Sequence, residues 1–277
     1  MSNISFLKED FYKSNFFIEK FNSHLVVIDT PKINILSEIL VQKINTILKQ
    51  KFKLNEISKV HKILGESEKI YDLKFGINKF TSNFYEIGEN FKKNFLKLLK
   101  ENIRDIIGED FYFQNNPTLR IQVPHETSEI FYPFFHSDIQ LGHPPYGTNL
   151  WMPLNSPSLI EGYGFSISDL KDSIKTFEEL NFEFDDLKNN KKKYSEKLIS
   201  HSKLQNFEFG KSVLFDSRCL HSTLPLKNHT RASIDVRIVP VSEFEKFSHI
   251  YQGSGRKKVL FAPGKAYNKQ SIDNVVL

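Results

Sequence analysis

The chain has 277 residues, 39% of them hydrophobic, which is enough to bury a large core within one domain. Its net charge of +5 comes from scattered lysines rather than from a basic face with interleaved aromatic residues, so the composition argues against a nucleic-acid binder. The one cysteine, Cys219, excludes an intramolecular disulfide, and no apolar run has signal-peptide character or membrane-spanning length. We therefore expect a soluble, cytoplasmic protein that acts on a small molecule.

The first part of the chain, residues 1–109, is predicted to be mainly helical. A short strand, Ser23–Asp29, precedes a helix that Asp29 or Thr30 is expected to cap, with Pro31 in its first turn. Apolar residues recur at helical spacing after it and again from about Phe80 to Ile107, where Gly108 is expected to end a second amphipathic helix.

From residue 110 the hydrophobic pattern changes to period two. The candidate strands are Thr118–Pro124, Phe131–Asp138, Asn149–Leu154, Phe207–Asp216 and Arg231–Val239. Residues 168–202 are charged and have helical character, which predicts an insertion, and residues 241–277 form a C-terminal extension with little pattern. Without repeats or a long linker, the whole chain, 1–277, is predicted to be one domain. Its fold class is mainly β with flanking helices (α+β), with a barrel or jelly roll over residues 110–240.

Three candidate strands carry unusual polar faces. In the last of them, alternate residues share one side, and they are Arg231, Ser233, Asp235 and Arg237. Arg120 and Gln122 alternate with apolar residues in the same way, as do Asn149 and Trp151. A half-exposed sheet produces such alternation without any function, but Arg, Gln, Asn and Trp also suit the lining of a polar pocket.

The pair His136 and Asp138 suggests a metal site. On a strand, residues two apart point to the same side, so an imidazole and a carboxylate converge here. A second imidazole completes the two-His-one-carboxylate triad that binds iron(II) and leaves positions open for other ligands. His221, just after the strand that ends at Asp216, is the candidate. The pair alone also occurs by chance on surface strands.

A cosubstrate site is suggested by Arg231, ten residues after His221, and by Ser233. A guanidinium binds the distal carboxylate of a five-carbon oxo diacid through a two-pronged fork, and a hydroxyl completes the pocket. The alternative for Arg231 is a structural salt bridge with Asp235 or Glu208.

Together these motifs resemble the iron(II)/2-oxoglutarate-dependent dioxygenase superfamily. The resemblance spans residues 110–240, is densest in Phe135–Leu154 and Leu214–Arg237, and is similar to the phytanoyl-CoA dioxygenase-like and streptomycin-biosynthesis-oxygenase-like enzymes. It implies a double-stranded β-helix (jelly-roll, cupin-like) barrel, with Fe(II) and 2-oxoglutarate as cofactors. The implied iron ligands are His136, Asp138 and His221, and the implied cosubstrate contacts are Arg231, Ser233, Asn149, Gln122 and Thr148. Residues 157–164 depart from the loop sequence usual in the phytanoyl-like group, which leaves the subfamily open.

Within that resemblance, the carboxylate of Asp138 favours hydroxylation over halogenation, because related halogenases replace it with a small residue. The polar faces favour a small polar substrate such as a sugar or amino-acid derivative, with Trp151, His143 and Arg237 as candidate contacts. A structural role for His143 beside two prolines is the alternative for that residue. Two other interpretations of the chain remain: a cupin-type metal enzyme that does not use 2-oxoglutarate, and a ligand-binding jelly-roll module.

Overall fold

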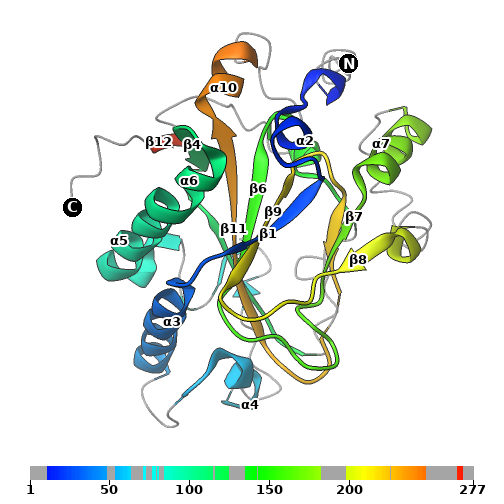
Figure 1. The fold of residues 1–277 in the computed structure, drawn as a ribbon. Coiled ribbons are helices and arrows are strands. Elements are labelled where there is room, and N and C mark those ends of the chain that lie inside the picture. The colour runs from blue at the N-terminus through cyan, green and yellow to red at the C-terminus, as the bar shows by residue number, and fades with distance from the viewer. Residues whose placement is uncertain are drawn as a thin grey trace.

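The computed structural model describes residues 11–48, 54–63, 71–72, 77–78, 80, 84–114, 116–124, 135–141, 143–181, 198–224, 226–247 and 267–270. Figure 1 shows a large twisted sheet in the centre of the molecule. The helices α3 (Ile33–Ile47), α5 (Glu89–Leu98) and α6 (Arg104–Ile107) lie to one side of it, and the strands β7 (Phe165–Ser168) and β8 (Ser202–Leu204) lie to the other. The expected fold class, mainly β with flanking helices, is confirmed.

The helical part begins with α2 (Phe16–Phe21), β1 (Leu25–Asp29) and α3 (Ile33–Ile47). Short elements follow: η1 (Ile57–Lys59), α4 (Val60–Ile63) and the paired strands β2 (Tyr71–Asp72) and β3 (Ile77–Asn78). The expected cap of α3 is wrong. Lys32 is the N-cap and makes no side-chain cap bond. The hydroxyl of Thr30 instead binds the Gly210 carbonyl and the Ser212 hydroxyl, at the start of strand β9 (Lys211–Asp216), and so does not cap the helix.

The second predicted helix exists but is interrupted. It consists of a 3-10 turn η2 (Phe84–Ile87), α5 (Glu89–Leu98), a π turn η3 (Leu99–Ile103) and α6 (Arg104–Ile107). Gly108 ends it in the left-handed conformation, φ 79°, as expected for a glycine at this position.

The large sheet has seven antiparallel strands. They run in the order β1, β9 (Lys211–Asp216), β6 (Thr148–Pro153), β11 (Arg231–Pro240), β4 (Phe111–Gln114) and β12 (Tyr267–Gln270), and β5 (Thr118–Gln122) also pairs with β11. Four of the five predicted strands lie in it, within a few residues of their expected bounds. The expected C-terminal extension contributes β12 and the helix α10 (Val241–Phe247).

A second, three-stranded sheet was not predicted. It consists of β10 (His221–Thr223), β7 (Phe165–Ser168) and β8 (Ser202–Leu204). The predicted insertion therefore starts and ends in strands. It does contain α7 (Leu170–Glu179), which Asp169 caps through the Lys171 amide, while residues 182–197 lie outside the described part. The pairings of the described strands give separate sheets, not a single closed barrel.

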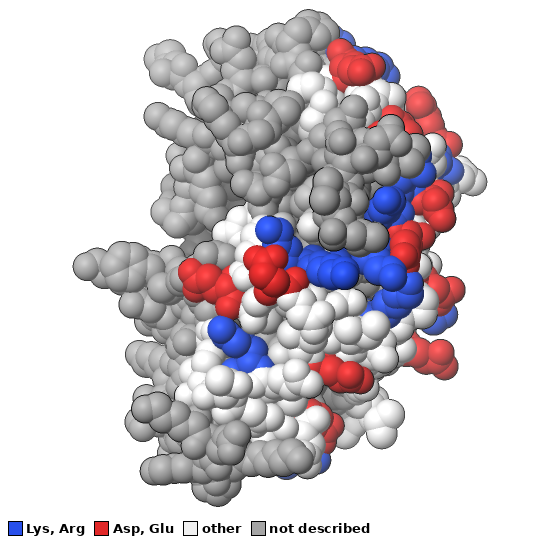
Figure 2. Space-filling view, turned by 90° about the vertical axis from the view of Figure 1, so that its left-hand side faces the viewer, with Lys and Arg blue, Asp and Glu red and all other residues white. Residues whose placement is uncertain are grey.

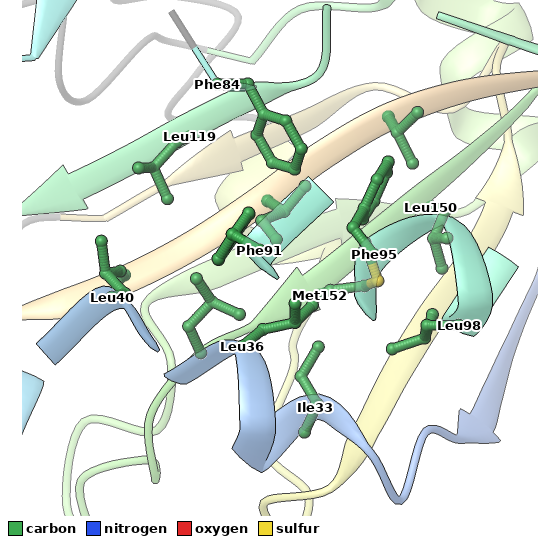
Figure 3. Close-up of a cluster of buried hydrophobic side chains, with 14 of the residues drawn as sticks. Ile33, Leu36, Leu40, Phe84, Phe91, Phe95, Leu98, Leu119, Leu150 and Met152 are labelled. Carbon is green, nitrogen blue, oxygen red and sulfur yellow. The ribbon is translucent and has the colours of Figure 1, made fainter. Parts of the chain in front are cut away.

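The main core lies between the helices and one face of the large sheet. Figure 3 shows Leu36 and Leu40 of α3 and Phe91 and Phe95 of α5 packed towards Met152 of β6. The apolar residues of β11 belong to the same cluster, and they are Ala232, Ile234, Val236 and Ile238. The predicted alternation is thus confirmed, and the polar face of the sheet is turned away from the helices, towards the small sheet.

The surface gives no sign of a basic face on the side that can be inspected. In Figure 2, lysine and arginine side chains are interspersed with aspartate and glutamate over the described part of that side. No helix in the described ranges combines the length and the apolar character needed to cross a membrane.

Candidate metal centre

His136, Asp138 and His221 come together between the two sheets. One potential ligand atom from each lies within 4.8 Å of the others. His136 sits in a single β-bridge, Asp138 begins a 3-10 turn η4 (Asp138–Leu141), and His221 begins β10. The predicted strand Phe131–Asp138 is therefore wrong at its end, and residues 131–134 lie outside the described part. The turn, rather than strand alternation, brings the carboxylate to the imidazoles.

The two histidines are joined through their main chains. The His136 amide donates to the His221 carbonyl at 3.0 Å, and the His221 amide donates to the His136 carbonyl at 2.8 Å. Their rings stand 4.5 Å apart, centre to centre. Paired backbone bonds of this kind fix where both Cβ atoms lie, so the separation of the imidazoles does not depend on side-chain packing alone.

The hydrogen bonding of His221 leaves Nε2 as its potential ligand atom. Its Nδ1 lies 3.1 Å from the Cys219 carbonyl, which can only accept a hydrogen bond, so the proton resides on Nδ1. Burial lowers the pKa of His221 below its ordinary value, although the Asp138 carboxylate opposes that effect. The imidazole is therefore neutral with a free Nε2, the form that binds a metal.

Asp138 is held by a guanidinium. Arg237 of β11 donates from Nη2 to Oδ1 at 2.6 Å and from Nε to Oδ2 at 2.9 Å, and its Nη1 binds Gln114 Oε1 at 3.1 Å. Burial by itself raises the pKa of this 1%-exposed carboxyl, but Arg237 and His221 outweigh that effect and hold the pKa well below the usual range. The carboxylate is thus ionised. Arg237, which was expected to contact substrate, lines the pocket, and its guanidinium is bonded to the candidate ligand Asp138.

The three candidate ligands line one pocket. Asn149 and Trp151, which the sequence analysis named as candidate cosubstrate and substrate contacts, also line it. Two more residues of the polar faces, which were not singled out as site residues, also line it. Arg120 donates from Nε to Asp235 at 2.8 Å, and their side chains are 24% and 19% exposed. Their positions on the polar faces were the available signal.

Arg231 is fully buried on the same sheet face. Its Nη1 donates to the Tyr163 carbonyl at 2.5 Å, and its guanidinium lies 5.7 Å from the ring centre of Trp151. The Asp235 carboxylate is bonded to Arg120. It does not form the salt bridge with Arg231 that the sequence left open as an alternative. Gln122 stands opposite Arg231 in β5 and donates to the Thr223 hydroxyl at 3.2 Å.

Several buried polar atoms on this sheet face have no hydrogen-bond partner among the described residues. They are the amide oxygen and nitrogen of Asn149 and the hydroxyl of Ser233. Buried polar atoms are nearly always bonded, so the amide of Asn149, which lines the pocket, points to a ligand. Arg231, Ser233 and Gln122 are not among the residues that line the pocket. The Thr148 hydroxyl is also buried without a partner. However, Thr148 alternates onto the other face of β6, with Leu150 and Met152, and is not among the residues that line the pocket.

His143 lies beside the centre but outside the pocket lining. It is buried, and its backbone amide donates to the Asp138 carbonyl at 3.2 Å. That contact helps to shape the turn that presents the carboxylate. This hydrogen bond supports the alternative interpretation of His143, that it has a structural role.

No family model and no curated protein matches the chain. Similar solved structures include EctD from S. alaskensis, determined with 2-oxoglutarate and 5-hydroxyectoine (12% identity, TM-score 0.49, covering 82% of this chain and 74% of that one). Another is SnoK, a non-heme α-ketoglutarate-dependent carbocyclase from nogalamycin biosynthesis (13%, 0.48, 95% of each chain). A third is HygX from Streptomyces hygroscopicus, with nickel and 2-oxoglutarate bound (10%, 0.47, 82% and 86%). At these scores the likeness carries no argument about this chain, and its function has to be argued from the site.

Proposed function

We propose that the protein is an iron(II)- and 2-oxoglutarate-dependent oxygenase that hydroxylates a small polar molecule, with release of succinate and CO2. The observation that carries the proposal is the convergence of His136, Asp138 and His221 within 4.8 Å beside a pocket. In this proposal the large and small sheets are the two halves of a double-stranded β-helix, and the site lies between them.

The donor set fits iron. Two imidazoles and one carboxylate are the ligands of non-haem iron(II) oxygenases, and three protein ligands leave coordination positions for an oxo acid and dioxygen. His221 is neutral and Asp138 is ionised, as ligands must be. The Asp138 carboxylate also favours hydroxylation over halogenation, because it fills the position that chloride needs.

The buried polar atoms fit 2-oxoglutarate. Arg231 is proposed to bind its C5 carboxylate, since a guanidinium fork matches a carboxylate, and the Ser233 hydroxyl adds a donor. Asn149, whose amide has no partner among the described residues, and Gln122, opposite Arg231 in β5, are proposed as further contacts of the same molecule. Bound iron and 2-oxoglutarate together supply the oxidising chemistry through decarboxylation to succinate.

The chain itself contributes position and exclusion of water. Trp151, Phe165 and Phe215 line the pocket beside His221 and keep the surroundings of the centre apolar. Arg120 and Asp235 give the same pocket a charged side. Arg120 binds Asp235 through Nε, and its two terminal nitrogens make no hydrogen bond to the described residues, so they are proposed to contact a substrate. These groups favour a polar metabolite such as a sugar or amino-acid derivative over a fatty acyl chain.

The test is an anaerobic titration of the apoprotein with iron(II) in the presence of 2-oxoglutarate, following the weak visible charge-transfer band of the chelate. We expect a band that requires both components and that disappears in His136→Ala. Tight iron binding without a band would instead support a cupin-type metal enzyme and would remove Arg231 from the site. The His136→Ala protein must be shown to be folded by circular dichroism.

A further inference from the structure

We propose that Arg237 is a positioning residue that restricts Asp138 to binding the metal through one oxygen, and thereby keeps a coordination position free for 2-oxoglutarate. The inference rests on the proposed function, because it concerns the same centre. What it adds is a role for a residue that is neither a ligand nor a cosubstrate contact.

The geometry carries the first step. Both oxygens of Asp138 accept a bond from the fork of Arg237, at 2.6 and 2.9 Å. Each carboxylate oxygen has two acceptor positions, so the fork occupies one on each and leaves one on each. A metal that chelated both oxygens would have to approach the same edge of the carboxylate that the fork occupies. A metal that binds one oxygen from its remaining side does not meet the fork.

The surroundings make the fork rigid. Arg237 is itself nearly buried, and its third nitrogen binds Gln114 on the neighbouring strand β4. Charge-assisted forks in a buried site are strong, and a planar guanidinium has one orientation that serves both bonds. The Asp138 side chain is therefore held in one rotamer before any metal arrives.

The second step is electrostatic. A divalent metal and a guanidinium that share one carboxylate repel each other at short range in a poorly screened site. The fork therefore lowers the affinity for metal, unlike the carboxylate or carbonyl partners that usually support metal ligands and strengthen them. If the fork keeps Asp138 to one oxygen, its loss should strengthen metal binding and weaken the later binding of 2-oxoglutarate. A purely structural role, or a role in substrate binding, predicts neither the stronger metal binding nor the weaker 2-oxoglutarate binding.

The chain provides a matched control in Arg218 and Asp216. This pair is also buried and also forms a fork, from Nε at 2.9 Å and from Nη2 at 2.7 Å. Arg218 binds the Phe11 carbonyl as well. Neither residue is a candidate ligand, so a change at Arg218 tests what the loss of a buried fork does by itself.

The experiment uses the full chain and two binding constants. Trp151 is the one tryptophan and lines the pocket, so its fluorescence reports both events. Cobalt(II) is titrated into the wild type, Arg237→Gln, Arg237→Lys and Arg218→Gln, and 2-oxoglutarate is then titrated into each cobalt-loaded protein. For Arg237→Gln we expect cobalt to bind about tenfold more tightly and 2-oxoglutarate about tenfold more weakly, the usual size of effects from residues that support ligands.

The other variants separate charge from geometry. Arg237→Lys keeps the positive charge but cannot form the fork, so cobalt affinity should rise less than in Arg237→Gln while 2-oxoglutarate affinity still falls. Lysine also keeps the protein testable if the glutamine variant does not fold. Arg218→Gln should leave both constants unchanged, whatever it does to thermal stability.

Each other outcome rejects the idea. If both constants weaken together in Arg237→Gln, the arginine is a structural strut; if neither changes, it has no role in positioning Asp138. Failure of the proposed function is visible separately, because the wild type itself then shows no cobalt binding or no response to 2-oxoglutarate. A spectroscopic check is the charge-transfer band of the iron form, which should change position in Arg237→Gln.

Discussion

The two faces of the central strand β11 are both buried but differ in chemistry. Nine of the ten residues of β11 are buried, and the one exception, Asp235, lies in the pocket. On the helix side these residues are apolar and join the main core. On the other side they include Arg231, Ser233 and Arg237. Burial alone therefore does not show that a residue of this protein is structural. The apolar buried residues stabilise the fold, whereas the polar buried residues belong to the candidate site.

The difference has an energetic reason. Burying a polar or charged group costs free energy unless the group is bonded, so a whole polar face inside a protein has to be matched by partners. Part of the match is internal, as between Arg237 and Asp138. The side-chain atoms of Asn149 and Ser233 have no partner among the described residues, and the proposed function assigns them to a ligand.

The largest effect should come from the apolar face. Phe95 is fully buried and packs edge-on against Phe84, with ring centres 4.8 Å apart. Phe95→Ala should lower the free energy of unfolding by about 3–5 kcal/mol, measured by urea denaturation, because it leaves a large cavity. At temperatures where the variant remains folded, cobalt affinity should equal that of the wild type. Weaker metal binding in the folded variant would show that the two faces are not independent.

A change on the polar face should produce the opposite pattern. Arg231→Lys should weaken 2-oxoglutarate binding about 10- to 100-fold, since an ammonium cannot reproduce the guanidinium fork. Metal affinity measured without 2-oxoglutarate should not change. Arg120→Lys is the control, because that arginine lines the pocket but is assigned to the substrate side. If the two variants lose the same amount of 2-oxoglutarate affinity, the assignment of Arg231 as the residue that binds the cosubstrate is contradicted.

Two serines, Ser233 and Ser212, are expected to show the same separation of binding from stability with smaller effects. Ser233→Ala should weaken 2-oxoglutarate binding by about 1 kcal/mol but leave stability unchanged, because its hydroxyl has no partner in the described structure. Ser212→Ala should do the reverse, since the Ser212 hydroxyl shares a 2.8 Å bond with Thr30. Calorimetric binding and thermal unfolding of both variants check this exchange of effects. A loss of stability in Ser233→Ala would contradict it.

The smallest effect concerns the loop that supports Arg231. Glu161 accepts bonds from the Lys227 and Asn228 amides, lies 3.3 Å from His229, and is two residues from Tyr163, whose carbonyl binds Arg231. Burial lowers the pKa of His229 below 6.5, while Glu161 opposes that effect. The folded state then binds fewer protons than the unfolded state, so this residue's contribution to stability falls as the pH drops through about 6.5.

His229→Gln should therefore flatten the decline in stability between neutral and mildly acidic pH, as followed by urea denaturation at several pH values. The core variant Phe95→Ala should leave the slope of that decline unchanged, because no titrating group is involved. An unaltered slope in His229→Gln would contradict the direction of the His229 shift.

Much of the sheet and of the site could be predicted from the sequence. Period-two patterns locate β5, β6, β9 and β11, and the same patterns place Asn149 and Trp151 on the pocket side. The short strands β7 and β10 escaped prediction because three or four buried residues carry no readable period. The partners of charged groups escaped for a different reason. Arg237 and Asp138 are distant in the chain, and alternation fixes a face but not the carboxylate that an arginine meets.

The backbone bridge between His136 and His221 has a consequence for how this chain can vary. Two hydrogen bonds fix the spacing of these ligands, although the small sheet's other strands and helix α7 lie between them in the chain. Lengthening or shortening a connecting segment changes the free energy of closing it only slowly. The connecting segments around helix α7 can therefore be lengthened or shortened, by divergence or by grafting, while the candidate ligands His136 and His221 keep their positions.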